Sequence, residues 1–410
     1  MGHCRAAGGV LGHTQPARLS RPRSEGLVVF VPTRGDLPPR HGPDVPLLPA
    51  GAEPATVPAS VYRDPERYER ERTDVLARTW QIVCRSSQIP AAGDHQVWEG
   101  QGETIVVTRR RDGGVTGFHN VCQHRGARIV KESGCGARRF RCRWHNWTYD
   151  LEGAVLGVPD REDFAPEQLD GLAAPPVECA EWGGWVWVVL AGPGVAPPLT
   201  EWLGPELTGD LGAYRMEDML LIDKLEFDLP VNWKVVIDGF NENYHAPALH
   251  RVPAQDVKDG RESTFFHWGP HGMMVVPYKG VLPRLKESRD HQGLAICHYT
   301  VFPTAVFNNN PNHLQLFRAV PLAVDRTRFE TWELQYDPQG DEDYTAEVDA
   351  HWERLKQVVA EDVEIYGEVA ATRTSSAYTR NVLNDHECKI THFHRTVQRM
   401  LDAGEARREQ

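Results

Sequence analysis

Short runs of β-branched and aromatic residues follow one another between positions 80 and 190. Residues 81–84, 104–107 and 184–189 are the clearest of them, and Gly, Asp and Pro separate the runs. Such runs, bounded by turn-forming residues, are typical of strands. Residues 80–190 are therefore predicted to form a small antiparallel β domain.

The chain before this region divides into two parts. Residues 1–55 are rich in Pro, Gly, Arg and His without a sustained hydrophobic period, so they bury too little apolar surface to offset the entropy of ordering. We predict that this extension is disordered. Residues 56–79 are predicted to hold a helix that packs on the C-terminal half of the chain, because Asp64 is a good N-cap and Pro65 suits a first helical turn.

A stretch rich in proline and glycine, residues 191–198, marks the boundary to a second domain. Beyond it, alternating patterns and helical periods follow each other. The predicted strands lie around 217–229, 272–278, 294–307, 313–321 and 327–336. The predicted helices lie around 232–250, 343–370 and 385–401. Residues 191–405 are therefore predicted to form an α+β domain with long C-terminal helices.

The composition narrows the class of protein. The chain has 57 Asp and Glu against 45 Lys and Arg, a formal charge of -12, which argues against a protein that binds nucleic acid through clustered basic residues. No apolar stretch approaches the roughly 20 residues that cross a bilayer, and the N-terminus lacks the order of a secretory signal. We expect a cytoplasmic protein that binds neither nucleic acid nor a membrane.

Two short segments combine cysteine with histidine. Cys122 and His124 are followed, after seventeen residues, by Cys142 and His145, so two loops each offer one thiolate and one imidazole to a common point. Two thiolates and two imidazoles suit a tetrahedral zinc ion, and they also suit an iron–sulfur cluster with mixed ligands. These four residues alone indicate a metal site of either kind.

A pair of histidines, His245 and His250, has Pro247 between its members. On a regular helix a step of five residues leaves two side chains about 140° apart, which is poor geometry for chelation. Because proline disfavours helical geometry at the preceding residue, the helix is predicted to end or distort at Ala246, so that His250 turns back toward His245. Without further context, such a pair is more often a packing or surface feature.

The helix predicted around 343–370 carries one acid on its apolar face. Apolar residues recur there at three-and-four spacing, namely Trp352, Leu355, Val359 and Tyr366. Asp362 falls on the same stripe. An unpaired carboxylate on a buried face is costly, whereas a metal ligand is not, so Asp362 is a candidate ligand. Glu361 and Glu364 fall off the stripe and are predicted to be solvated. The alternative is that Asp362 is a surface residue of a frayed helix.

Two acids precede the histidines on the predicted helix. Asp238, Glu242 and His245 stand at positions i, i+4 and i+7, so they are predicted to share one helical face. A carboxylate placed against an imidazole in this way orients the ring. The alternative is that Glu242 caps a surface helix.

These segments resemble the ring-hydroxylating oxygenase family. Residues 120–127 together with 141–153 closely resemble its Rieske domain, and residues 232–250 resemble its catalytic-domain signature. Asn146 stands where the family usually has Gly, and Asn tolerates the left-handed backbone better than most residues. The resemblance spans residues 60–402.

One comparison within the wider Rieske class points to the oxygenase branch. Respiratory Rieske proteins carry two further cysteines that form a disulfide beside the cluster. Ala127 and Trp144 stand in those places here, so that disulfide cannot form.

The resemblance implies two cofactors. A Rieske-type [2Fe-2S] cluster would have one iron held by Cys122 and Cys142 and the other by His124 and His145. A mononuclear ferrous iron would be held by a facial triad, which the resemblance places at His245, His250 and Asp362. The family's Glu-Asp pair in the corresponding helix matches residues 361 and 362.

The resemblance also implies how the two sites cooperate. In the family, the acid three residues before the first iron-binding histidine bridges to a cluster histidine of the neighbouring subunit, and Glu242 holds that place here, where most relatives have Asp. Asp238, Glu242 and Tyr244 are therefore candidate catalytic residues. The expected assembly is a head-to-tail homotrimer of this chain. The resemblance also allows an additional β subunit. A separate NAD(P)H-dependent reductase, directly or through a ferredoxin, would supply the electrons.

The expected fold is a small Rieske domain plus a helix-grip-like catalytic domain. The expected reaction is O2-dependent hydroxylation or dihydroxylation of a small organic substrate, with an aromatic or cyclic compound favoured. The alternative is oxidative demethylation of a quaternary ammonium or methoxy substrate, and a non-catalytic Rieske electron carrier or a zinc-binding protein are rival classes. Candidate pocket residues are Phe265, Phe266, Trp268, Met273, Met274, Phe302, Phe307, Asn308, Asn310, His313 and Phe317.

Overall fold

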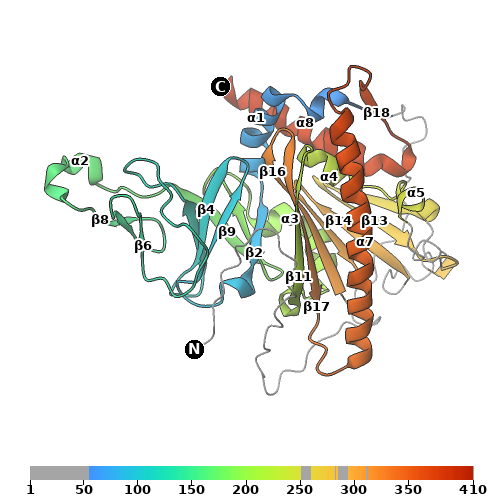
Figure 1. Ribbon diagram of the computed structural model, residues 1–410, viewed down its shortest axis with the longest axis horizontal. Coiled ribbons are helices and arrows are strands. Elements are labelled where there is room, and N and C mark those ends of the chain that lie inside the picture. Colours follow the sequence, from blue (N-terminus) through green and yellow to red (C-terminus); the bar gives the residue numbers. More distant parts are fainter. Residues whose placement is uncertain (1–54, 251–259, 282, 285–293, 311–312, 410) are drawn as a thin grey trace.

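A β-rich region containing residues 80–190 projects from a larger body that holds the widest sheet and the longest helices (Figure 1). The structure, a computed structural model, describes residues 55–250, 260–281, 283–284, 294–310 and 313–409. The disorder predicted for residues 1–55 falls, apart from Ala55, outside the described residues. The predicted α+β class is confirmed.

Two antiparallel sheets make up the β-rich region. The larger has the order β2-β10-β9-β5-β4-β3. Its strands are β2 (Gln81–Arg85), β3 (His95–Gly100), β4 (Glu103–Arg109), β5 (Val115–His119), β9 (Pro176–Trp182) and β10 (Trp185–Val189). The smaller consists of β6 (Phe140–Arg141), β7 (Thr148–Tyr149) and β8 (Val155–Gly157). Figure 1 shows that the smaller sheet lies at the end of the molecule farthest from the larger body.

Seven antiparallel strands form the sheet of the larger body, in the order β11-β17-β16-β15-β14-β13-β12. They are β11 (Leu220–Leu229), β12 (Thr264–Trp268), β13 (His271–Pro277), β14 (Ala295–Val301), β15 (Ala305–Asn309), β16 (His313–Ala323) and β17 (Arg326–Gln335). The single strand predicted over 294–307 is wrong, since the chain reverses after Val301 and Ala305 pairs back with it. Strand β12 was not predicted.

Helices cover both faces of this sheet. On one face, α4 (Trp233–Phe240), α7 (Glu342–Thr372) and α8 (Cys388–Arg408) share an apolar core with side chains of the central strands. On the other, α3 (Leu199–Gly212) and strand β10 pack against the sheet. No helix in the described ranges has an apolar stretch long enough to span a bilayer.

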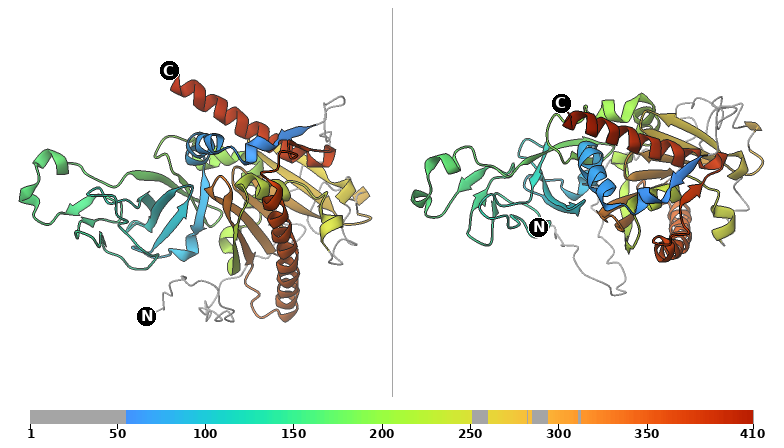
Figure 2. Two further views of the ribbon diagram at one scale, coloured as in Figure 1. Left: turned by 45° about the horizontal axis from the view of Figure 1, so that its top comes forward. Right: turned by 90° about the horizontal axis from the view of Figure 1, so that it is seen from above.

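The N-terminal segment of the described chain lies against the C-terminal one (Figure 2). Strand β1 (Thr56–Pro58) pairs with β18 (Arg380–Val382), and helix α1 (Pro65–Asp74) contacts α8. Asp64 caps α1 by accepting hydrogen bonds from the backbone N–H groups of Glu66 and Arg67, at 2.9 and 3.3 Å.

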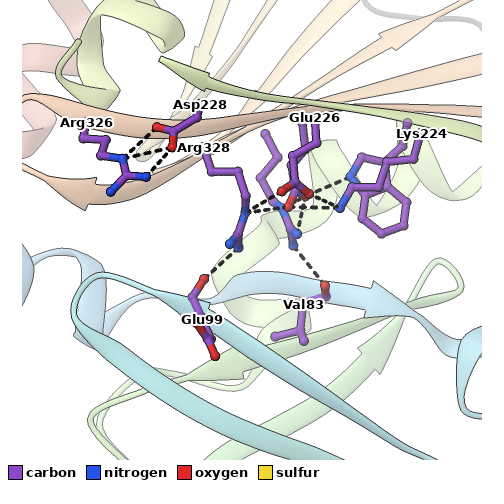
Figure 3. Close-up of polar contacts among 10 residues, drawn as sticks. Val83, Glu99, Lys224, Glu226, Asp228, Arg326 and Arg328 are labelled. Atoms are coloured by element: carbon purple, nitrogen blue, oxygen red, sulfur yellow. Dashed lines mark hydrogen bonds and ion pairs between the residues drawn. The ribbon is translucent and has the colours of Figure 1, made fainter. Parts of the chain in front are cut away.

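A buried ion cluster joins the two parts of the molecule (Figure 3). Arg318 on β16 donates to the carbonyl oxygens of Ile82 and Val83 on β2, at 2.5 and 3.1 Å, and forms an ion pair with Glu330 on β17. Lys224 on β11 lies 3.1 Å from the same carboxylate. Burial alone would raise the pKa of Glu330, but the positive charges, Arg318 first among them, outweigh burial and lower that pKa to about 2.

Candidate metal centres

The two loops that carry the cysteine–histidine pairs have the same backbone design. In each loop the cysteine N–H donates to the carbonyl oxygen five residues further on, from Cys122 to Ala127 at 2.7 Å and from Cys142 to Trp147 at 2.9 Å. Both cysteines lie in the core beneath the small sheet, together with Phe140 of β6. The loops therefore present matched donors from one rigid base.

A left-handed residue closes each loop. Gly126 has φ +75° and Asn146 has φ +59°, and their N–H groups donate back to the carbonyl oxygens of Cys122 and Cys142 at 2.9 and 3.0 Å. Asn at position 146 therefore supports the turn, as predicted from its tolerance of left-handed backbone.

The donor atoms of these loops form two pairs. His124 Nδ1 and His145 Nδ1 lie 3.1 Å apart. Cys122 and Cys142 are both buried, and the Tyr149 hydroxyl donates to Cys122 Sγ at 3.2 Å. Burial raises the pKa of Cys122, and the neighbouring Cys142 thiol adds to the rise.

The paired arrangement discriminates between the two kinds of metal site. A single tetrahedral zinc ion at about 2.0 to 2.3 Å from each ligand requires all four donors to surround one point. Donor atoms that bind one ion lie close to one another. Among the described residues, only one group of three or more donors lies within 4.8 Å of one another, and it contains none of these four residues. The four residues therefore do not surround a single ion. Thiolates on one iron and imidazoles on a second iron match the two pairs.

The second set of donors comes from α5 and α7. His245 precedes the single-turn helix α5 (Ala246–Leu249) and His250 follows it. Their Nε2 atoms lie 3.7 and 3.6 Å from the same oxygen of Asp362, and the three donors are the group whose atoms all lie within 4.8 Å of one another. Two imidazoles and one carboxylate in this arrangement form the facial triad that suits ferrous iron.

The continuous helix predicted around 232–250 is wrong. Helix α4 ends at Phe240, residues 241–245 are irregular, and α5 begins at Ala246. Pro247 lies in the first turn of α5, where its missing N–H leaves no hydrogen bond unmade, so it does not end a helix at Ala246 as predicted. The imidazoles converge because α5 is one turn long.

A carboxylate holds each imidazole by its outer nitrogen. Glu242 binds His245 Nδ1, and Glu361 Oε2 lies 3.0 Å from His250 Nδ1. Such contacts fix the ring orientation and the tautomer, and they leave both Nε2 atoms directed at Asp362. Glu361 is therefore only partly solvated, with 24 % of its side chain exposed, and the prediction that it is solvated missed this contact. The sequence signal for this contact was that Glu361 directly precedes the candidate ligand Asp362.

Asp238 is not brought to the triad. Its buried carboxylate accepts a hydrogen bond from the Tyr62 hydroxyl at 2.6 Å and lies 3.0 Å from His394 Nε2. The common helical face predicted for Asp238 and His245 does not form, because α4 ends between them. Tyr244 is 66 % exposed and its side chain lies on the surface.

The electrostatics of the triad favour a bound cation. Burial raises the pKa of Asp362 to about 7; Glu242 and Glu361 add to this rise, whereas His245 opposes it. Burial lowers the pKa of His245, but its contact with Glu242 outweighs burial and raises that pKa. A divalent ion would stabilise the ionised carboxylate and balance the charge of three neighbouring acids.

The triad lies in the wall of a cavity of about 670 Å³. Residues of α4, α5, α7 and strands β13 to β16 line it, and the lining includes Phe240, Tyr278, His298, His351 and Arg354. Of the candidate pocket residues, Asn308, Asn310 and Phe317 line the cavity. The remaining candidates do not, and most are buried in the cores around the sheet.

Replacing Glu361 with glutamine should weaken metal binding at the triad about 10- to 100-fold, because the His250 ring loses the carboxylate that orients it. Glu364→Gln is the matched control, since Glu364 is an exposed acid one turn further along α7. Iron content after dialysis against graded chelator measures the effect. Equal retention of iron by the two variants would contradict the assigned contact.

The paired cysteine and histidine loops and the separate triad together suit an iron-dependent redox protein. Comparison with known proteins narrows the class. Residues 79–174 match the Rieske [2Fe-2S] domain and residues 216–403 match the catalytic domain of the ring-hydroxylating alpha subunit.

Several relatives are similar over much of the chain. The carnitine monooxygenase oxygenase subunit of Escherichia coli is 28% identical over 265 residues, which cover 62% of this chain and 68% of the relative. The biphenyl dioxygenase alpha subunit of Paraburkholderia xenovorans is 25% identical over 306 residues, which cover 63% of this chain and 66% of the relative. The crystal structure of the quaternary ammonium Rieske monooxygenase CntA with L-carnitine has the same fold, with a TM-score of 0.71, 21% identity and coverage of 86% and 98%.

The chain belongs to the Rieske non-heme iron oxygenases. It is an oxidoreductase of that family, whose members bind a Rieske [2Fe-2S] cluster and a mononuclear iron and act with O2, a substrate and an electron-transfer partner.

Proposed function

We propose that Cys122, Cys142, His124 and His145 bind the cluster, and that a separate triad binds the mononuclear iron. The triad is His245, His250 and Asp362. The observation that carries the assignment is the convergence of these three donors on one point in a cavity wall, with a carboxylate behind each imidazole. When bound, the cluster supplies single electrons and the ferrous ion supplies oxygen activation.

The chain's own residues prepare these sites. Glu242 and Glu361 hold the two imidazoles in the tautomer that presents Nε2 to the metal. The apolar side chains of Phe240 and Phe317, stacked with ring centroids 4.2 Å apart, form part of the cavity wall and exclude water from the reacting region.

We also propose a head-to-tail trimer. The cluster loops near β6 to β8 and the triad near α5 lie at opposite ends of the molecule in all views (Figures 1 and 2). The triad therefore needs electrons from the cluster of another copy. Glu242, which holds His245, is the proposed bridge to the neighbour's His145. Each copy donates to one neighbour and accepts from the other, which closes into a ring.

The substrate that we propose is a small quaternary ammonium compound. One oxygen atom of O2 enters a C–H bond next to nitrogen, and the other leaves as water with two electrons and two protons from an NAD(P)H-dependent reductase. The resulting α-hydroxy ammonium ion breaks at its C–N bond and releases its hydroxyl proton, which gives a tertiary amine and an aldehyde. The aromatic rings of Phe240 and Tyr278 in the cavity lining suit a quaternary ammonium group.

Polar groups in the cavity favour this substrate over an aromatic hydrocarbon. Asn308 and Asn310 are at least nine-tenths buried there, and Arg354 contributes a positive charge. A hydrocarbon would leave the Asn308 side-chain oxygen, which has no partner among the described residues, still unpaired, and this costs binding free energy. Aromatic dioxygenation, the activity named for the biphenyl relative, is therefore the second candidate.

Metal and product analysis tests the proposed function. The purified protein should contain about three irons and two acid-labile sulfides per chain, as the two sites require. With a reductase and NADH, it should consume O2 and release an aldehyde from quaternary ammonium compounds such as carnitine. Two irons per chain would contradict the triad assignment, and a cis-diol from biphenyl without any aldehyde from ammonium compounds would favour the second candidate.

A basic surface surrounds the cluster loops and suits an acidic electron donor. Residues 125–143 contain seven Lys or Arg and one acid, and all eight are exposed, although the whole chain carries a formal charge of -12. Arg128 and Lys131 form ion pairs with Glu99 and Glu132. The other five basic residues, which make no ion pair among the described residues, can meet a partner's carboxylates.

Reversing one of these charges should weaken coupling to the donor. Arg139→Glu is expected to lower the rate of cluster reduction about tenfold at low ionic strength. Complementary charges on two proteins mainly raise the rate at which they associate, and this variant removes one such charge. The same reversal at Arg380, an exposed residue of β18, is the control. Stopped-flow reduction at increasing NaCl measures both variants, and a rate for Arg139→Glu equal to that of the control at all salt concentrations would refute this surface.

A further inference from the structure

Helix α7 contributes a positive charge to the cavity lining in addition to the triad acid. Arg354, Val358 and Asp362 line the cavity at positions i, i+4 and i+8 of α7. Eight residues advance about 12 Å along a helix, so Arg354 stands about two turns from the triad. Arg354 is exposed whereas Asp362 is 7 % exposed, so the guanidinium lies in a more accessible part of the lining than the triad carboxylate.

This guanidinium has no counter-ion in the described part of the chain. The neighbouring acid Glu353 instead forms an ion pair with Lys356, at 2.7 Å. Within the described lining, Arg354 is the only Lys or Arg, and the two acids, Glu242 and Asp362, both contact His245. Among the described residues, the cavity lining therefore offers one positive charge without a counter-ion.

A second polar group faces the same cavity from the sheet. Asn308 on β15 is 7 % exposed, and its Oδ1 atom is buried without a hydrogen-bond partner in the described part of the protein. Its neighbour Asn310 differs, because it donates to Gln315 at 3.3 Å, and Gln315 donates to Glu333 at 2.8 Å. An unpaired buried acceptor costs about 1 to 3 kcal/mol, so a ligand hydroxyl or N–H group bound there would recover that free energy.

We propose that the substrate carries a carboxylate, that Arg354 binds this carboxylate, and that Asn308 accepts a hydrogen bond from a hydroxyl or N–H group nearer the triad. This inference rests on the proposed function and specifies its substrate as a zwitterion with its two charges at opposite ends. A guanidinium binds a carboxylate through two parallel hydrogen bonds, which fixes the axis of the bound molecule. The ammonium end then points inward, toward the aromatic rings and the triad.

Binding measurements on the purified full-length protein test the proposal without depending on turnover. Carnitine, glycine betaine and benzoate are each compared with their methyl esters by titration calorimetry, in the wild type, Arg354→Gln and Arg354→Lys. Wild type should bind at least one acid about tenfold more tightly than its ester. The preference should not be larger, because the guanidinium is exposed and solvent screens its charge. Arg354→Gln should lose this preference while binding the ester as before, and Arg354→Lys should retain part of it.

Two further variants complete the test. Lys356→Gln removes a positive charge from the same helix outside the cavity lining and should leave the preference unchanged. Asn308→Leu should weaken binding of carnitine, which has a hydroxyl group, more than binding of glycine betaine, which has none. Equal affinity of the wild type for all acids and their esters, or an undiminished preference in Arg354→Gln, would overturn the proposal. Failure of the proposed function would look different, because carboxylate binding would depend on Arg354 while no O2 was consumed.

Discussion

Asp362→Ala is expected to lose more than about 100-fold in product formation while its visible spectrum stays that of an intact Rieske cluster. The alanine removes the one carboxylate that both imidazole Nε2 atoms face, so an iron bound there as proposed would lose a ligand. Loss of a single contact that orients a metal ligand typically lowers metal affinity or activity about 10- to 100-fold, so loss of the ligand itself should lower activity further. Iron should fall from about three to about two per chain.

The control for this variant is Asp349→Ala, which removes an exposed acid from the same helix. It should retain full iron content and activity. Unimpaired turnover by Asp362→Ala would show that another residue holds the iron.

Glu330→Gln is expected to lower the free energy of unfolding by about 3 to 5 kcal/mol. Glu330 is buried among three positive charges, and removal of one partner from such a cluster leaves the others uncompensated in a low-dielectric interior. The matched control is Asp228→Asn, which breaks the exposed ion pair to Arg326 on the same two strands (Figure 3) and should cost at most about 1 kcal/mol. Urea unfolding of both variants measures the difference, and equal costs would contradict the role of burial.

The same carboxylate makes stability depend on pH. Its pKa is about 2 in the folded chain and near 4.5 when unfolded, so the folded state binds fewer protons between these values. Its contribution is fully present above about pH 5 and decreases as the pH falls toward 2. Wild type should therefore lose about 2 kcal/mol more than Glu330→Gln between pH 6 and pH 3. Unfolding midpoints measured from pH 6 down to pH 3 should converge, and parallel curves would contradict the ion cluster.

Some of the site followed from local sequence because one signal was enough. Asp362 breaks an otherwise apolar stripe, and that stripe is buried in the structure, so periodicity alone brought the carboxylate to the protein interior. The paired loops were equally accessible, because each cysteine and histidine stand within four positions of one another.

Other features depend on contacts that sequence spacing does not encode. Glu361 lies off the apolar stripe, but α5 approaches α7 from the side, and His250 therefore meets Glu361 as well as Asp362. The break between α4 and α5 was missed because residues 241–245 contain no proline or glycine to mark it. Asp238 was misplaced for the same reason, since a helix that continued would have turned it toward His245.

The cavity lining was the least predictable part. Neighbouring positions of a strand face opposite sides of a sheet, so Phe307 packs in the core while Asn308 faces the cavity. Which side becomes the cavity depends on where α7 crosses the sheet, and that crossing is a tertiary feature. Arg354 was missed because an exposed arginine on a long helix has no distinguishing mark in the sequence.

The contacts of Arg318 have a consequence for how electrons can be controlled. Its guanidinium ties the backbone of β2 to the centre of the larger sheet, and Arg328 makes a second tie by donating to the Glu99 carbonyl oxygen at 2.7 Å. These contacts hold the β-rich region against the larger body. In the proposed ring of subunits, the tunnelling distance between one copy's cluster and the next copy's iron would be set by how the copies pack. Mutations at the contact between copies should then change electron transfer more than mutations that loosen either sheet.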